Sequence, residues 1–202
     1  MNISKEKIAL MLVEIGCLKF GEFTLKSGMK SPVYIDLRIL VSFPRQLKII
    51  GQAYAQVLAK LTYDRLAAVP YAALPLCCAA SFATGKPWIY TRKEEKTHGI
   101  KKPIEGLYKS GETVVVIDDL ITTGLSKIEV IKPLQEIGLK VKDIIVLVDR
   151  EQGGKEQLAA KGYKLHCVLK FSEMLKILKD KNKISQKIFQ ETLDFLQKTK
   201  AK

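Results

Sequence analysis

Hydrophobic and polar positions alternate along this chain with two periods, which together predict strands interleaved with helices. Short apolar runs indicate strands at residues 65–71, 87–90, 114–117, 143–150 and 164–171. Apolar residues at helical spacing predict helices at residues 44–60, 73–83, 126–138 and 154–161, with two more near the C-terminus. Ser172 is the expected N-cap of the first of these two. The alternation is typical of a parallel α/β sheet, whose ligands bind beyond the carboxyl ends of its strands.

The N-terminal part follows a different pattern. Residues 1–16 predict an amphipathic helix with Ile8, Leu12 and Ile15 on one face. Residues 20–37 alternate apolar and polar positions on either side of Ser27 and Gly28, which is typical of a β-hairpin. By contrast, residues 92–106 are polar, rich in lysine and without periodicity, so we expect a mobile loop there.

Composition favours one globular domain. The chain has 202 residues, of which 47% are hydrophobic and 27% charged, enough to build a full core. We expect a single domain over residues 1–202, with an N-terminal hood at about 1–40 and C-terminal helices at about 172–200. No apolar run approaches the ~20 residues that span a bilayer, and the N-terminus does not resemble a signal peptide.

The cysteines and the net charge narrow the class of protein further. Cys17, Cys77, Cys78 and Cys167 show no C-x-x-C spacing, which argues against zinc and disulfides and for a cytoplasmic protein with reduced thiols. The formal net charge of +13 could indicate a nucleic-acid binder. Because the lysines are scattered and many lie in the C-terminal tail, a solvated basic surface is the favoured interpretation. An anionic substrate would explain only a few of them.

The stretch VVVIDDLITTGLS, residues 114–126, carries the strongest chemical signal. An apolar run leads into Asp118 and Asp119, whose adjacent carboxylates would repel each other unless a ligand binds them. Hydroxyl-bearing residues and Gly124, which tolerates a positive φ, then lead into a helix N-terminus, where anions bind. The combination predicts a site for a phosphorylated sugar. Neutralising both aspartates should strongly reduce that function and leave the fold intact.

Each part of this stretch also has an ordinary structural explanation. An Asp pair after a strand is often a solvated turn, and a Thr/Ser/Gly cluster is often a helix cap. The combination is more specific, and it resembles the phosphoribosyl pyrophosphate (PRPP) motif of the type I phosphoribosyltransferases. No Walker phosphate loop, G-x-x-x-x-G-K-[ST], occurs in the chain.

Three more motifs narrow the resemblance. The segments FGEFTLKSGMKSPVYID, TRKEEKTHG and VDREQGG flank the PRPP motif in the order found in orotate phosphoribosyltransferases. That resemblance implies the type I phosphoribosyltransferase fold, a mainly parallel central sheet flanked by helices with a small N-terminal helix and hairpin hood. It also implies transfer from PRPP to orotate, giving orotidine 5′-monophosphate and pyrophosphate, in de novo pyrimidine synthesis. Mg²⁺ would be held mainly by PRPP oxygens, with no direct protein ligand.

The resemblance further implies roles for individual residues. Asp118 and Asp119 would contact the ribose hydroxyls, and the 5′-phosphate would lie on Leu120, Ile121, Thr122, Thr123, Gly124, Leu125 and Ser126. The other PRPP contacts would be Lys26, Tyr71, Ala72, Arg92, Lys93, Lys96 and His98. Orotate would meet Tyr34, Ile35, Thr122 and Arg150. Lys96 is the first choice for the catalytic cation, beside the two aspartates.

The loop that carries Lys96 is expected to cover the neighbouring subunit's site in a homodimer. Three positions depart from the family pattern: Leu125 in the phosphate loop, Thr97 beside the loop lysine, and Ala72 in place of a lysine found in some members. Two alternatives stay open, a phosphoribosyltransferase for another base and a non-catalytic regulator that senses PRPP. The chain is too short to include a fused decarboxylase, although a longer natural protein could carry one.

Overall fold

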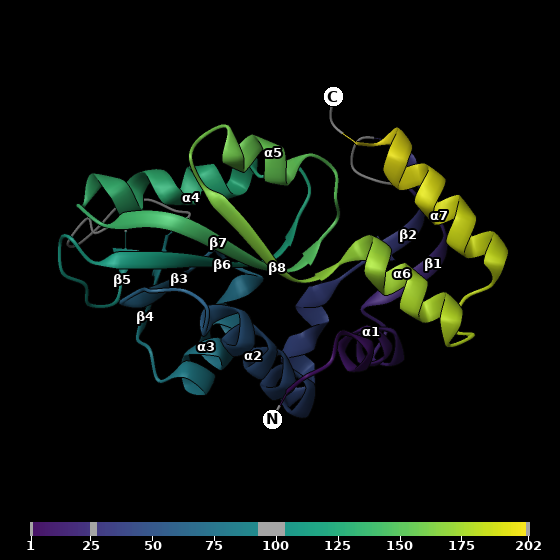
Figure 1. Ribbon diagram of the computed structural model, residues 1–202, viewed down its shortest axis with the longest axis horizontal. Coiled ribbons are helices and arrows are strands. Elements are labelled where there is room, and N and C mark those ends of the chain that lie inside the picture. The colour runs from purple at the N-terminus through teal and green to yellow at the C-terminus, as the bar shows by residue number, and fades with distance from the viewer. Residues whose placement is uncertain (1, 25–27, 93–103, 201–202) are drawn as a thin grey trace.

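A six-stranded sheet forms the centre of the molecule (Figure 1). The computed structural model describes residues 2–24, 28–92 and 104–200. The strand order is β5–β4–β3–β6–β7–β8, and every neighbouring pair is parallel except β4 and β5. The strands are β3 (Arg65–Ala68), β4 (Trp88–Thr91), β5 (Ile104–Glu105), β6 (Thr113–Ile121), β7 (Lys140–Asp149) and β8 (Lys164–Lys170). The prediction of a mainly parallel α/β sheet is confirmed.

The order of the strands creates a switch point between β3 and β6. From β3 the chain crosses to β4 on one side, whereas β6 is followed by β7 and β8 on the other side. In open α/β sheets, ligands bind where the strand order reverses in this way, at the carboxyl ends of the strands. Tyr71 and Ala72 follow β3, and β6 carries the acidic pair Asp118 and Asp119.

Helices cover both faces of the sheet (Figure 1). One layer consists of α2 (Pro44–Leu58) and α3 (Ala73–Thr84), and the other of α4 (Leu125–Glu136) and α5 (Gly154–Ala159). Side chains of β6 alternate between them: Val115 and Ile117 belong to the core under α2 and α3, and Val114 and Val116 to the core under α4. Because both faces are covered, the strand has the continuous apolar run from which it was predicted.

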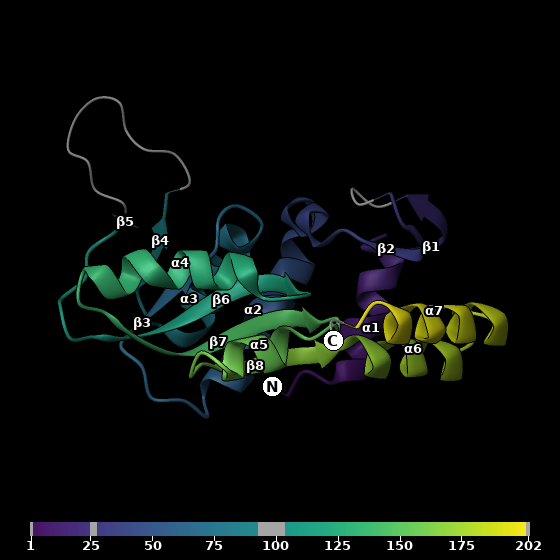
Figure 2. The ribbon, with the colours of Figure 1, turned by 90° about the horizontal axis from the view of Figure 1, so that it is seen from above.

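The N-terminal elements form the small hood that was expected. Helix α1 (Lys5–Glu14) is capped by Ser4, whose Oγ accepts a hydrogen bond from the Lys7 amide at 3.1 Å. Strands β1 (Leu18–Thr24) and β2 (Lys30–Ile35) then pair as an antiparallel hairpin, followed by a 3₁₀ helix, η1 (Leu37–Ser42). Figures 1 and 2 show the hairpin beyond the carboxyl ends of the central strands, where it can cover the switch point.

The C-terminal helices correct one prediction. Helix α6 (Phe171–Asp180) begins one residue before Ser172, so Ser172 is not its N-cap. Strand β8 ends at Lys170 and the helix begins at the next residue, Phe171, whose side chain is fully buried. The Ser172 amide is satisfied instead by Glu151, whose Oε2 accepts its hydrogen bond at 2.9 Å. Helix α7 (Gln186–Lys198) is capped by Ser185, whose Oγ accepts a hydrogen bond from the Ile188 amide at 3.2 Å.

The described residues contain no helix that is both long and apolar enough to span a membrane. All four cysteines are free thiols. Burial raises the pKa of Cys17 to about 12 and that of Cys167 to about 11, so these two remain neutral thiols at physiological pH.

Candidate active site

The acidic pair lies inside the central strand rather than beyond its end. The apolar run predicted a strand that stops at Ile117, but β6 continues to Ile121. It continues because Asp118 and Ile121 keep their parallel register with Val146 and Asp149 of β7. The carboxylates are therefore held on a regular, buried backbone, which fixes their position better than a turn would.

The acidic pair lies past the end of β3 because β3 is shorter than β6, and we call this part of the sheet edge, beyond the end of β3, the crevice. The last paired residue of β3, Ala68, lies opposite Ile117, so residues 118–121 extend past the end of β3. The chain after β3 turns there into α3. Tyr71 follows a cis peptide bond and is 57% exposed, and Ala72 occupies the N-cap position of the helix. The structure thus brings the predicted pyrophosphate turn to the same crevice as the acidic pair.

A buried lysine neutralises the first carboxylate. Lys127 Nζ lies 2.6 Å from Asp118 Oδ2, and both side chains are only 6% exposed. The same ammonium group donates to the Leu120 carbonyl at 2.7 Å. A buried charge without a partner costs several kcal/mol, so each member of this pair depends on the other. We therefore expect neutralisation of Asp118 to destabilise the fold, in contrast to the expectation from the sequence.

Sequence reasoning missed Lys127, although a signal was present. Lys127, Ile131 and Leu134 are the buried residues of α4, and they follow an i, i+4, i+7 stripe. Lys127 begins this stripe in the first turn of a helix that follows an acidic strand. A lysine at such a position indicates a buried ion pair. The residue was passed over because lysines in helices are usually solvated.

The second carboxylate is held in a different electrostatic state. Burial, and next to it the negative charge of Asp118, raise the pKa of Asp119 to about 7. Its Oδ1 accepts a hydrogen bond from the Leu120 amide at 2.8 Å. On the side of α2, the buried Tyr54 hydroxyl donates to the Asp118 carbonyl at 2.7 Å and anchors the backbone of the pair. Asp119 is thus a partly buried carboxylate that a cationic or hydroxyl-bearing ligand would stabilise.

The loop after the acidic pair has the predicted shape. Leu120 and Ile121 complete β6, and Thr122 and Thr123 form a half-buried bend. Gly124 then adopts φ 91° at the N-cap position of α4, as expected from its tolerance of positive φ. Its carbonyl accepts the Lys127 amide at 3.0 Å.

The large residue in this loop does not fill it. The side chain of Leu125 is 62% exposed, and Ser126 next to it is also exposed. The departure from a small residue at position 125 therefore changes the surface of the loop and leaves its turn at Gly124 in place.

The arginine predicted to bind orotate lies half-buried beside this loop. The Arg150 amide donates to the Ile121 carbonyl at 3.1 Å, which places Arg150 next to Thr122. Its Nε is buried and has no hydrogen-bond partner among the described residues. Burial lowers the pKa of the guanidinium, which means that the cation lacks a compensating anion. A ligand carboxylate would satisfy both deficits.

The segment that carries Arg150 is anchored at several points. Glu151 has a positive φ of 59°; its amide donates to Asp149 Oδ1 at 2.8 Å and its carboxylate caps α6 at Ser172. Gln152, which is buried, donates through its side-chain amide to the Thr199 hydroxyl after α7. The C-terminal helices therefore hold the segment from outside the sheet.

Gly154 joins this segment to the loop. A Cβ at Gly154 would lie 2.6 Å from the Thr122 carbonyl oxygen and 2.6 Å from Ile121 Cγ1, closer than real Cβ atoms come. Helix α5 can therefore pack against Thr122 only if residue 154 has no side chain. The last glycine of the DREQGG motif is explained by this close approach.

Gly154→Ala should therefore lower the stability of the protein by about 1–3 kcal/mol, because Thr122 must move to admit a methyl group. Urea unfolding followed by circular dichroism measures the change. Lys155→Ala is the matched control, since Lys155 is exposed one residue further along the same helix. An unchanged midpoint for Gly154→Ala would show that the loop is not in contact with α5.

The predicted base-contact residues of the hairpin lie on β2. The Tyr34 ring stands 5.6 Å from that of Phe23, and its hydroxyl accepts a hydrogen bond from Arg38 Nη2 at 3.2 Å. Arg38 is in turn paired with Asp36 at 2.7 Å. Tyr34 is 36% exposed, whereas Ile35 packs partly against the main core. Tyr34 is therefore a pre-oriented aromatic surface rather than a core residue.

Several predicted residues fall at or outside the edge of the described chain. Arg92 follows β4, and its Nη1 lies 2.6 Å from Glu105 Oε1 of β5. This ion pair joins the end of β4 to β5, the two strands that the lysine-rich segment connects in the sequence. Lys26, Lys93, Lys96, Thr97 and His98 lie outside the described residues.

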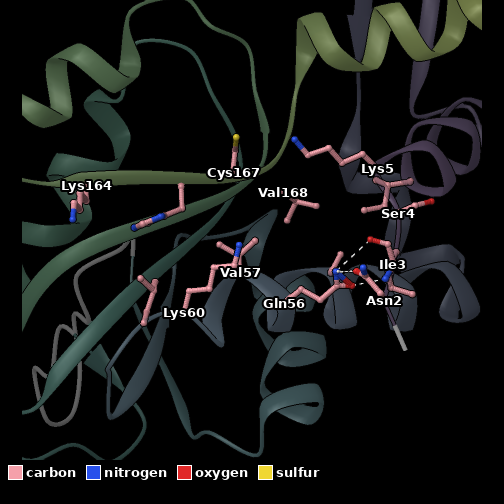
Figure 3. A pocket seen from close by; sticks show the side chains of 14 residues that line it. Asn2, Ile3, Ser4, Lys5, Gln56, Val57, Lys60, Lys164, Cys167 and Val168 are labelled. Carbon is pink, nitrogen blue, oxygen red and sulfur yellow. Dashed lines mark hydrogen bonds between the residues drawn. The ribbon is translucent and has the colours of Figure 1, made fainter.

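A separate cavity of about 700 Å³ lies away from these residues, between the N-terminal segment, α2 and β8 (Figure 3). Lys60 and Lys164 line it, and at one end Gln56 Nε2 donates a hydrogen bond to Asn2 Oδ1 at 2.8 Å. None of the residues assigned to substrate lines it. The crevice at the switch point, and not this cavity, is the candidate active site.

The fold and the site define a class of protein. A sequence model of the family described as "Phosphoribosyl transferase domain" matches residues 52–166, from α2 to β8. The matched region contains both strands of the switch point, the acidic pair, the following loop and Arg150. The chain is thus built as a phosphoribosyltransferase.

Its relatives make the assignment more specific. The chain is 38% identical over 172 residues to the orotate phosphoribosyltransferase of Pyrococcus abyssi, covering 84% of this chain and 94% of the relative. It is 40% identical over 182 residues to the bifunctional enzyme PyrF/PyrE of a Nostoc species, covering 90% of this chain. The chain belongs to the orotate phosphoribosyltransferase family. It spans only 38% of the length of the Nostoc relative.

Solved structures agree with this assignment. The UMP synthase of Leishmania donovani superposes with a TM-score of 0.89 at 41% identity, covering 97% of this chain and 43% of that one. The orotate phosphoribosyltransferase of Mycobacterium tuberculosis, solved in complex with PRPP, superposes with a TM-score of 0.71 at 26% identity. That match covers 84% of this chain and 97% of the other.

Proposed function

We propose that this chain catalyses the transfer of the ribose 5-phosphate group from PRPP to orotate, giving orotidine 5′-monophosphate and pyrophosphate in de novo pyrimidine synthesis. Family membership supports the reaction. The observation that carries the choice of base is Arg150, a half-buried cation beside the loop whose buried Nε has no hydrogen-bond partner among the described residues. Among the common bases of this reaction class, orotate brings a carboxylate that would pair with such a guanidinium.

The crevice suits the other substrate as well. We assign the 5′-phosphate to the bend at Thr122 and Thr123 and to the N-terminus of α4, where backbone amides and the helix dipole favour an anion. The ribose hydroxyls fall to the acidic pair. The turn at Tyr71 and Ala72 would contact the pyrophosphate from across the crevice. A relative solved in complex with PRPP supports PRPP as the substrate.

The chemistry requires charge stabilisation more than proton transfer. As the bond from the anomeric carbon to pyrophosphate breaks, positive charge develops on the ribose and negative charge on the leaving group. A carboxylate at Asp119 would stabilise the first, and Lys96 with Arg92, Lys93, Lys26 and His98 the second. Orotate arrives as an anion, so no strong base is required, and Arg150 would orient it.

Mg²⁺ fits the site as a companion of the substrate. Of the two carboxylates in the pair, one is committed to Lys127, and the described residues hold no cluster of three acidic, cysteine or histidine side chains that could bind a metal ion by themselves. Mg²⁺ retains oxygen ligands from substrate phosphates and water, and it binds through only one or two carboxylates. When bound, it would neutralise the leaving pyrophosphate. We assign it mainly to PRPP oxygens.

We further propose that residues 1–202 act as one domain in a homodimer, located in the cytoplasm. Family resemblance supports the dimer, and free cysteines support the location. In the dimer the lysine-rich loop would reach the neighbouring PRPP site, since its highly charged sequence has no apolar run to anchor it on its own subunit.

Incubation with PRPP, Mg²⁺ and one base at a time tests the reaction itself. Orotate should be consumed, as its absorbance reports, while uracil, hypoxanthine and adenine should not. A phosphoribosyltransferase for another base would reverse that order. A regulator that only senses PRPP would bind it, as seen by a rise in melting temperature, without turning over any base.

Complementation tests the shared site. A Lys96→Ala protein mixed with an Asp119→Asn protein should regain up to a quarter of wild-type activity, because hybrid dimers hold one intact site when subunits exchange freely. Exchange is verified by mass spectrometry of one isotope-labelled partner. A mixture that exchanges but stays inactive would show that each loop serves its own subunit.

A further inference from the structure

The buried lysine of α4 contacts the acidic strand at two points. Lys127 Nζ lies 2.6 Å from Asp118 Oδ2 and 2.7 Å from the Leu120 carbonyl, with Ser126 Oγ at 3.3 Å. An ammonium group has three protons to donate, and these three acceptors use all of them. The first turn of α4 is thereby fastened to the strand on both sides of Asp119.

This contact commits the first carboxylate to the protein. Asp118 Oδ2 is paired with Lys127, and Asp118 Oδ1 accepts the Asp119 amide at 2.8 Å. Asp118 is 4% exposed. Both of its oxygens therefore already have partners, and little of the side chain can be reached from the crevice.

The second carboxylate is left available. Asp119 is half-buried rather than buried, and no described cation pairs with it directly. Oδ1 accepts the Leu120 amide at 2.8 Å, and the carboxyl group also shares a side-chain hydrogen bond with Asp118, which raises its pKa. A ligand hydroxyl or cation that replaced this contact would favour the ionised form of Asp119. The described charged or titratable groups that act on Asp119 are Asp118, which opposes its ionisation, Lys127, which favours it, and the neutral Tyr54 hydroxyl.

We infer that Lys127 is a positioning residue that divides the work of the acidic pair. It holds Asp118 as a structural anchor under the loop and leaves Asp119 as the carboxylate that contacts the ribose. The role of Asp119 toward the ribose rests on the proposed function, whereas the anchoring of Asp118 by Lys127 does not. It differs from the assignment of both aspartates to the ribose, which the family resemblance implies.

A cycle of unfolding measurements tests the anchor without substrate. Lys127→Met and Asp118→Asn should each lower the urea midpoint by about 1 M, because each leaves its partner buried and less well compensated. The double variant should lose clearly less than the sum of the two. Lys132→Met, on the exposed side of the same helix, is the control. Additive losses would overturn the anchor, whatever the protein catalyses.

Kinetics then test the division between the two carboxylates. In Lys127→Met, the acidic limb of the pH profile of kcat/KM for PRPP should move up by about 0.5–1 pH unit, since Asp119 loses its nearest cation. The KM for orotate should stay within about twofold of wild type, which a general loosening of the site would not allow. An unmoved acidic limb would reduce Lys127 to a purely structural residue.

The double variant Lys127→Met/Asp118→Asn separates the carboxylates directly. It should retain at least ten times the kcat of Asp119→Asn, because Asp119 is still present. A kcat as low as that of Asp119→Asn would show that Asp118 contacts the substrate and would overturn the division. If the wild-type protein failed to use PRPP at all, the proposed function would fall, and the unfolding cycle would still decide the anchor.

Discussion

Asp119→Asn should lower kcat by about 10²–10³-fold and at the same time make the unliganded protein more stable at pH 8. The loss of rate is of the size seen when one charge-stabilising group is removed from a transition state. The carboxamide has nearly the same shape as the carboxylate, so the crevice is preserved. It lacks the negative charge that would face the positive ribose as pyrophosphate leaves.

The gain in stability follows from the raised pKa of this carboxyl. Its pKa is about 7 in the folded protein and near 3.8 when unfolded. The folded state therefore binds more protons between these two values, and stability falls as the pH rises from about 4 to about 7. Asparagine removes that loss. We expect a gain of about 1–3 kcal/mol at pH 8, which disappears below about pH 4.

Denaturant unfolding at pH 4 and pH 8, together with steady-state kinetics, measures both effects. Glu129→Gln, an exposed carboxylate on α4, is the control and should change neither. Asp118→Asn should behave in the opposite way and destabilise the protein, because it leaves Lys127 buried without its counter-charge. If Asp119→Asn is less stable than wild type at pH 8, the electrostatic account of the pair is wrong.

Arg150→Met should raise the KM for orotate by about 10²-fold while changing the KM for PRPP by less than about threefold. A charged hydrogen-bonded contact to a buried carboxylate is worth ~2–5 kcal/mol, because the carboxylate is otherwise left unpaired. Methionine fills much of the same volume, so the loss comes from the charge and not from a cavity.

The variant also makes a prediction about the protein without ligand. Arg150 Nε is buried without a partner, so replacing the guanidinium should not lower the unfolding midpoint and can raise it. The control acts on the ligand: uracil, which lacks the carboxylate, should react poorly with both proteins and show no dependence on residue 150. An equal rise of both Michaelis constants would indicate a general disturbance of the crevice rather than loss of one contact.

Sequence patterns alone predicted the order and type of the helices and strands near the site. The run 114–117 has apolar residues on both faces, and such a run can be buried only between two layers of helices. Gly124 adopts the positive φ that its position in the loop suggested. The helix stripe at Ile131 and Leu134 was equally clear. These features follow from local periodicity and backbone sterics, and both depend only on residues that are close together in the sequence.

Family resemblance in the motifs also identified the candidate residues of the site before their positions were known. The structure places Asp118, Asp119 and Arg150 around one switch point, with the turn at Tyr71 across the crevice. Their roles toward substrate remain proposals. Strand order places them together, since the carboxyl ends of adjacent parallel strands meet at one edge of the sheet.

The pairing of these charged residues could be seen in the tertiary structure but not in the sequence. Asp118 is paired with a lysine nine positions further on, and Arg150 Nε has no hydrogen-bond partner within the described part of the chain. The first turn of α6 is capped by Glu151 from another segment rather than by Ser172. Charge energies depend on burial and on the distances between side chains, and both are set by packing. Local sequence patterns therefore located the charged groups, and the fold determined which of them are already paired and which are open to a ligand.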